Sequence, residues 1–183
     1  LTDLNGHWAS DYADRLMGMN VIQGYADGTF QPSKEITRAE FVTLLSKALA
    51  LQTVASTTSF ADEEAVPAWA KSEIAAAVQA GIVTGYGDNT FKPDRTITRA
   101  EMAVMMTKAL KLSDVQAGTN GENAKPSFTD AAQTPAWAQE AMDTAVQANI
   151  INGYTDNTVR AENMTTRAEA TAMIYKLLLA MYL

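Results

Sequence analysis

The chain repeats one sequence pattern three times, and this repetition constrains its fold more than any other feature. The tetrapeptide Thr-Arg-Ala-Glu begins at Thr37, Thr98 and Thr166, so the copies are offset by 61 and then 68 positions. A Trp-Ala pair and a Gly-Tyr pair recur at the same two offsets. Three separate motifs do not share two offsets by chance, and the pattern predicts an architecture of repeated supersecondary units.

The shared offsets divide the chain into three copies joined by two polar connections. The copies are predicted at residues 1–52, 60–112 and 128–183, with linkers at 53–59 and 113–127. The second connection contains glycine and asparagine among polar residues, a composition typical of flexible linkers. We expect the three copies to form one module.

Each copy is predicted to contain a first helix that starts near the Trp-Ala pair. Apolar residues follow this pair at helical spacing. The residues at which the helix is expected to end are Asn20, Gly81 and Asn149. Asparagine and glycine tolerate the left-handed conformation that often follows a helix, so they are suitable for this position.

The Thr-Arg-Ala-Glu tetrapeptide predicts the start of a second helix in each copy. A threonine followed three residues later by glutamate forms a capping box, in which each side chain bonds to the other residue's backbone N–H. Apolar residues such as Phe41, Leu44 and Leu45 follow, and their spacing predicts a strongly amphipathic helix.

One copy of about 50 residues is too small to cover the apolar faces of two helices, so the copies must cover one another. The fold class expected is mainly α, with three tandem helix-loop-helix repeats. We expect the capped helices to meet in a central three-helix bundle, giving a pseudo-threefold module with three lobes. An open solenoid of stacked helix pairs is the alternative geometry.

An arginine directly follows the capping threonine in every copy. These residues are Arg38, Arg99 and Arg167. A cation is disfavoured in the first turn of a helix by a few tenths to about 1 kcal/mol. A bound anion would offset that cost, because unpaired backbone N–H groups and a guanidinium would converge on one carboxylate or phosphate.

Two other interpretations of these arginines remain open from the sequence. They are ordinary exposed residues of a first helical turn, or they form ion pairs with the aspartate near the start of each copy. These aspartates are Asp3, Asp62 and Asp130. An ion pair and an anion site are compatible with each other.

The aromatic residues of the repeats also allow two interpretations. Trp8, Trp69 and Trp137 stand near a helix start, where such rings often pack as hydrophobic staples. Partly exposed rings lining a cleft would equally suit the apolar face of a sugar. The Gly-Tyr pairs would supply a phenol and a close backbone approach beside them; they are Gly24 and Tyr25, Gly85 and Tyr86, and Gly153 and Tyr154.

Composition and the remaining polar residues exclude several classes of function. The net charge of −7 and the lack of a Lys/Arg run argue against nucleic-acid binding. No apolar stretch approaches the roughly 20 residues of a membrane helix, so membrane insertion is not expected. The single histidine, His7, is not repeated and there is no cysteine, so a metal site has little support. No carboxylate pair is placed for acid/base catalysis, and we expect neither enzymatic activity nor a cofactor.

The order of these motifs resembles the S-layer homology (SLH) domain family, which usually occurs as three tandem copies. The resemblance covers the chain apart from its linkers. It implies a pseudo-threefold, monomeric module at the bacterial cell wall, outside the cell, that anchors a surface protein. In that family the grooves between repeats bind secondary cell-wall polymer, a polysaccharide with pyruvate ketals on N-acetylmannosamine.

The resemblance also implies roles for the residues described above. Arg38, Arg99 and Arg167 would recognise the acidic ketal, and the aspartates, tryptophans and Gly-Tyr pairs would contribute further contacts. The third copy departs from the pattern at Val159 and Ala161, where the others have phenylalanine and proline, which predicts an altered or unused cleft. A scaffold for protein assembly and a wall-active hydrolase are the alternative functions.

Overall fold

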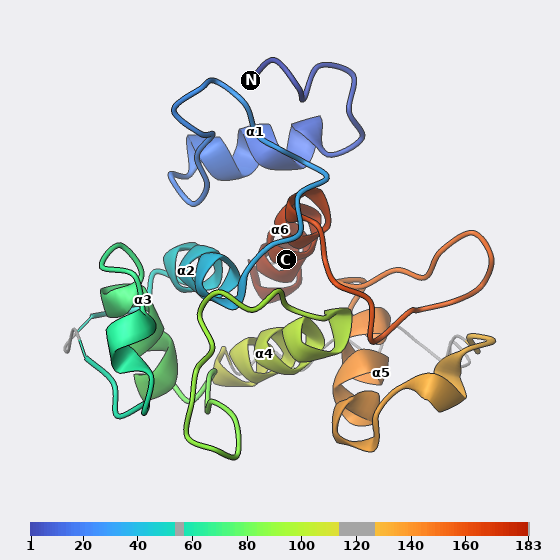
Figure 1. The fold of residues 1–183 in the computed structure, drawn as a ribbon. Coiled ribbons are helices and arrows are strands. Elements are labelled where there is room, and N and C mark those ends of the chain that lie inside the picture. Colours follow the sequence, from blue (N-terminus) through green and yellow to red (C-terminus); the bar gives the residue numbers. More distant parts are fainter. Residues whose placement is uncertain (54–56, 114–126, 183) are drawn as a thin grey trace. The chain divides into compact units, whose positions relative to one another are not determined.

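The computed structural model describes residues 1–53, 57–113 and 127–182, and these residues are mainly α-helical (Figure 1). Each predicted linker includes positions outside these ranges. Each copy contributes two α-helices, and their bounds are α1 Ser10–Gly18, α2 Arg38–Ala48, α3 Lys71–Gln79, α4 Arg99–Leu112, α5 Gln139–Gln147 and α6 Arg167–Tyr182. Short 3-10 turns precede the first helix of the later copies, namely η1 Glu63–Ala65, η2 Ala131–Gln133 and η3 Ala136–Ala138.

The predicted helix boundaries are confirmed. The capping boxes at the starts of α2 and α4 are complete, with the threonine and glutamate side chains each accepting a backbone N–H. Thr166 and Glu169 make the same two bonds at the start of α6. The first helices are followed by left-handed residues, with φ of 57° at Asn20, 75° at Gly81 and 62° at Asn149.

The residues divide into two compact units whose boundaries cut across the sequence copies. The first unit holds Leu1–Ile97 together with Thr165–Tyr175, and the second holds Thr98–Met164 together with the part of α6 from Lys176. In the first unit α2 packs on α3, and in the second α4 packs on α5. Each of these capped helices therefore packs on the first helix of the next copy.

The capped helices α2 and α4 are buried on almost all sides. Nine of the eleven residues of α2 are buried, including Thr43 and Ser46. The prediction of a strongly amphipathic helix was therefore wrong. The reason is that the next copy covers a face that a single repeat would leave to water; for example, the Ser46 hydroxyl on α2 donates to the Glu73 carbonyl on α3, at 2.8 Å.

A closed ring of three backbone hydrogen bonds joins the copies within the first unit. Ile36 N donates to Thr165 O, Thr165 N to Ile97 O, and Ile97 N to Ile36 O, at 2.9, 3.0 and 3.2 Å. These three residues occupy the same position in their copies, and all are fully buried. An open solenoid would not bring the third copy to the first, so this alternative is excluded. The threefold arrangement of the helices in one bundle stays a prediction.

Candidate ligand-binding site

The three motif arginines are among the most buried polar side chains in the described residues. Their exposed fractions are 4% for Arg38, 2% for Arg99 and 7% for Arg167. The interpretation of these residues as ordinary exposed members of a first turn was therefore wrong. Burial of a cation is costly unless polar groups compensate it, so its surroundings matter.

The backbone N–H groups of the first helical turn are already bonded. Arg38 N donates to Arg95 O at 2.8 Å and Ala39 N donates to Pro93 O at 3.0 Å. The starts of α4 and α6 bond in the same way to the third and first copies. The prediction that unpaired amides await an anion was wrong, because carbonyls of the next copy already accept from these groups.

Each guanidinium also donates to a carbonyl in the next copy. Arg38 Nε donates to Phe91 O and Arg99 Nε to Val159 O, both at 2.9 Å. Arg167 Nη2 donates to Gln23 O at 2.5 Å, which connects the third copy to the first. The arginines therefore help to fasten each copy to its successor.

Every motif arginine also lies against the tyrosine of a Gly-Tyr pair in that next copy. The distances from the guanidinium carbon to the ring centroid are 4.8 Å for Arg167 and Tyr25, 4.4 Å for Arg38 and Tyr86, and 4.8 Å for Arg99 and Tyr154. These are cation–π distances. Arginine and tyrosine, which the sequence separates widely, thus share one site.

Further cations surround the same tyrosines, and each tyrosine with its cations is called here a tyrosine site. The additional cations are Lys34 at Tyr25, Lys92 and Arg95 at Tyr86, and Arg160 at Tyr154. Sequence reasoning missed these four residues. The sequence did contain a signal for two of them. The position directly after the turn, which is formed by residues 88–91 in the second copy and 156–159 in the third, is basic in both, as Lys92 and Arg160.

Carboxylates balance part of this positive charge. Lys34 pairs with Glu40 at 3.4 Å, Lys92 with Asp88 at 3.5 Å and Arg160 with Asp156 at 2.9 Å. The hydrogen bond from Lys34 to the Tyr25 hydroxyl, together with Glu40, raises the pKa of Lys34. These lysines and Arg160 are well exposed, so their pairs are weak.

Arg167 differs from the other two motif arginines. Its Nε is buried and has no hydrogen-bond partner within the described residues, whereas Nε of Arg38 and of Arg99 donates to a carbonyl. Burial lowers the pKa of the Arg167 guanidinium, although Tyr25 and Glu40 act in the opposite direction. The site at Tyr25 therefore holds a buried cation with an unused donor.

The aspartates near the start of each copy hold the turn of their own copy. Asp3 accepts from the backbone amides of Phe30 and Gln31, both at 2.7 Å. The equivalent bonds of Asp62 and Asp130 measure 2.8 Å. Both oxygens of each carboxylate therefore accept from the backbone of their own copy, and ion pairs to the motif arginines stay a prediction.

The glycines of the Gly-Tyr pairs make room for the apolar residue that opens each copy. A Cβ on Gly24 would overlap Leu1, one on Gly85 would overlap Phe60, and one on Gly153 would overlap Phe128. The group that approaches each of these glycines closely is therefore a side chain of the protein itself. It fixes the opening segment against the loop that carries the tyrosine.

The tryptophans are exposed in all three copies. The exposed fractions of Trp8, Trp69 and Trp137 are 58%, 56% and 62%. The interpretation of these rings as packed core residues was therefore wrong, and their lining of a sugar-binding cleft stays a prediction.

A family model for the S-layer homology domain matches residues 1–42, 59–103 and 127–171. The three matches contain all the motif arginines and the tyrosine sites.

The chain belongs to the S-layer homology domain family.

Several curated proteins are similar to this SLH chain over most of its length. It is 34% identical over 177 residues to an exoglucanase, XynX, of Acetivibrio thermocellus, which covers 96% of the chain and 16% of the exoglucanase. It is 35% identical to a cellulosome-anchoring protein of the same species, over 84% of the chain and 34% of that protein. An S-layer protein of Bacillus thuringiensis subsp. finitimus is 32% identical, over 93% of the chain and 20% of that protein.

The SLH chain thus spans about a third or less of the length of these three relatives. The family and its surface-layer relatives assign the chain to the outside of the bacterial cell, in association with the cell wall. They also support a role in anchoring surface proteins to that wall. None of the described helices combines the length and apolar character that a bilayer crossing needs.

Proposed function

We propose that this SLH module anchors a surface protein by binding pyruvylated secondary cell-wall polymer at its tyrosine sites. In each site the motif arginine receives the carboxylate of a pyruvate ketal. The support comes from the family, from relatives named as surface-layer and anchoring proteins, and from the local charge at these sites.

The distribution of charge carries the proposal. Seven of the chain's 14 lysine and arginine residues lie against one of three tyrosines, although the net charge is −7. Two or three cations therefore gather in each site. Such a concentration favours an acidic ligand locally, because screening in physiological salt limits the effect of distant charges to about 8 Å.

Arg167 shows what an acidic ligand would contribute. Within the part of the chain that the structure describes, its buried Nε has no hydrogen-bond partner, and its guanidinium donates to a neutral carbonyl. A carboxylate could accept from this donor in a charge-assisted bond, which is about twice as strong as a neutral one. A planar guanidinium can hold a carboxylate at two points, which an ammonium cannot, so arginine suits this ligand better than lysine.

The remaining residues of the repeats are proposed to support the sugar. The exposed rings of Trp8, Trp69 and Trp137 offer apolar faces for stacking. The tyrosine of each Gly-Tyr pair lies against the motif arginine of its site. The aspartates would act on the ligand through the turns that they hold, with any direct contact remaining a prediction.

The same proposal makes the module a non-catalytic part of a longer protein. Its relatives include an exoglucanase and an S-layer protein, which share only the SLH portion with this chain. The part of the protein that is joined to the SLH module can therefore vary while the module stays the same. Several sites facing one repetitive polymer would raise the overall avidity without tighter contacts at any site.

The test is calorimetric titration with a pyruvylated wall polymer fragment and with the same fragment after removal of the ketal. We expect binding of the first and at least tenfold weaker binding of the second. Arg167→Lys should weaken binding at its site by about 1.5–3 kcal/mol, because an ammonium cannot donate to a carboxylate at two points as a planar guanidinium can.

Arg15→Lys is the matched control, because Arg15 is an exposed arginine against Tyr175 and lies outside the tyrosine sites. Thermal unfolding of each variant separates loss of binding from loss of fold. Equal binding of the two polymer fragments would contradict the proposal. Binding of a protein partner instead of either fragment would support the assembly scaffold.

A further inference from the structure

The third copy contains a pocket whose lining includes none of the cations of the tyrosine sites. Its volume is about 280 Å³, and it lies between the opening segment of the copy and α5. The lining residues that matter here are Phe128, Thr134, Gln139, Met142, Asp143 and Val159. Such a volume is at the lower limit of small-molecule pockets, which suits a ligand of one ring.

The second copy shows what fills the same place. The residue equivalent to Val159 is Phe91, which is fully buried and lies 5.6 Å from the ring of Phe60. Val66 and Ala75, both buried, stand where the third copy has Thr134 and Asp143. The third copy has therefore lost a ring from this small core and gained a hydroxyl and a carboxylate.

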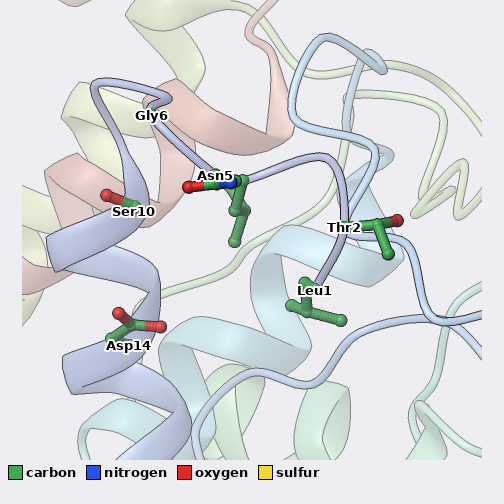
Figure 2. Close-up of a pocket in the computed structure, with 7 residues that line it drawn as sticks. Leu1, Thr2, Asn5, Gly6, Ser10 and Asp14 are labelled. Atoms are coloured by element: carbon green, nitrogen blue, oxygen red, sulfur yellow. The ribbon is translucent and has the colours of Figure 1, made fainter.

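The first copy has a pocket at the corresponding place, of about 650 Å³. Figure 2 shows Ser10 and Asp14 on one face of α1, with Leu1 and Asn5 of the opening segment across from them. Asp14 is the equivalent of Asp143 at the two repeat offsets. An aspartate thus lines the pocket in the first and third copies, and the second copy has Ala75 at this position.

The lining of the third-copy pocket combines an apolar wall with hydrogen-bonding groups. Phe128, Met142 and Val159 supply the wall. A hydroxyl, an amide and a carboxylate come from Thr134, Gln139 and Asp143, and Gln139 Nε2 is held by the Thr134 carbonyl at 3.3 Å. This combination fits a neutral sugar, which has apolar ring faces and hydroxyl donors at its edge. The carboxylate disfavours an anionic ligand.

We propose that the pocket beside α5 binds one neutral sugar unit. It is thus a second kind of site, distinct from the cationic tyrosine sites. Val159 borders both kinds, since its side chain lines the pocket and its carbonyl accepts from Arg99 Nε. If the proposed anchoring function holds, adjacent neutral and acidic sugars of one polymer can occupy the two sites. Binding of a neutral sugar in the pocket does not depend on the proposed anchoring function.

The experiment is an NMR titration of the full chain with N-acetylglucosamine, N-acetylmannosamine and glucose, and with glucuronate as an anionic sugar. We expect saturable shifts of the amides of Thr134, Gln139 and Asp143 with at least one neutral sugar, and a millimolar dissociation constant. Glucuronate should bind less tightly. These sugars carry no ketal, so the result is independent of ketal recognition by the arginines.

Two variants take their residues from the second copy. Val159→Phe should fill the pocket and abolish the shifts, and Asp143→Ala should weaken binding at least tenfold. Gln147→Ala, an exposed change elsewhere on α5, is the control. The absence of saturable shifts with every neutral sugar overturns the proposal, as does unchanged binding by Asp143→Ala; the latter comparison holds even if Val159→Phe misfolds.

Discussion

At the scale of single residues, arginine links structure and binding. Arg38, Arg99 and Arg167 each fasten a backbone carbonyl of the next copy and lie on its tyrosine. A planar guanidinium can stack and donate in its own plane at the same time, which an ammonium cannot. The carbonyl and the tyrosine of the next copy therefore offset the unfavourable free energy of a cation at a helix start.

Glycine provides the clearest stability test at this scale. Gly153→Ala should destabilise the fold by about 1–3 kcal/mol, because its Cβ would overlap the Phe128 ring in a packed contact. The φ angle of Gly153 is not in the left-handed region, so the effect is steric. The measurement is the free energy of unfolding in urea.

Gly87→Ala is the matched control. Its Cβ would meet no atom within 4 Å, and the first copy has Ala26 at this position. We expect a change within about 0.5 kcal/mol. If both variants unfold at the same urea concentration as the parent chain, the packing role of Gly153 is wrong.

At the scale of elements, each helix start and each turn depends on partners outside its own segment. The first-turn amides of α2, α4 and α6 donate to loops of another copy. The turns combine local and distant bonds: Asp88 accepts from Thr90, while the amide of Phe91 donates to Asp62. The loops that carry the tyrosines therefore bond both to their own copy and to the helix start of another copy.

The turn aspartates predict how stability depends on pH. The hydrogen bond from the threonine two residues later lowers the pKa of Asp27, Asp88 and Asp156. A lowered folded-state pKa gives a contribution to stability that is present above about pH 4 and is lost as the pH falls through the folded-state value. The melting temperature should therefore fall between pH 4 and more acidic conditions.

The triple variant D27N/D88N/D156N tests this contribution, since asparagine keeps the acceptor oxygen but does not titrate. We expect a flatter dependence of melting temperature on pH in the acid range than in the parent chain. Glu64→Gln, an exposed change on η1, should leave the parent's dependence in place. An equally steep fall in the triple variant would show that other carboxylates control acid unfolding.

At the scale of the whole molecule, the copies are joined in closed order. The first-turn amides of α2 donate hydrogen bonds to carbonyls of the second copy, and those of α4 donate to carbonyls of the third copy. The first-turn amides of α6 donate to carbonyls of the first copy. The buried ring of Ile36, Ile97 and Thr165 contains one residue from each. The three copies are therefore interdependent rather than a chain of independent repeats.

Removal of the third copy tests this interdependence. In a fragment of residues 1–112, Ile36 N would lose its acceptor and Gln23 would lose Arg167. We expect the fragment to retain helical circular dichroism but to lose the cooperative thermal transition of the full chain. A cooperative transition at the temperature of the full chain would show that the first two copies fold without the third.

Much of the local structure could be predicted because it depends on residues close in sequence. Capping boxes and left-handed helix ends involve neighbours within about five positions. Their regular recurrence then identified the family. The exposure of the tryptophans and the burial of the arginines could not be predicted, because both depend on which copy covers which surface.

The sequence by itself determined the repeat, the starts and ends of its helices, and the residue types available for binding, since these follow from local geometry and from the spacing of motifs. Only the tertiary structure decided that each arginine reaches the tyrosine of the next copy, that its helix-start amides are already bonded, and that further cations join it. Contacts between residues such as Arg167 and Tyr25 arise from packing of the copies, and no short-range pattern encodes that packing.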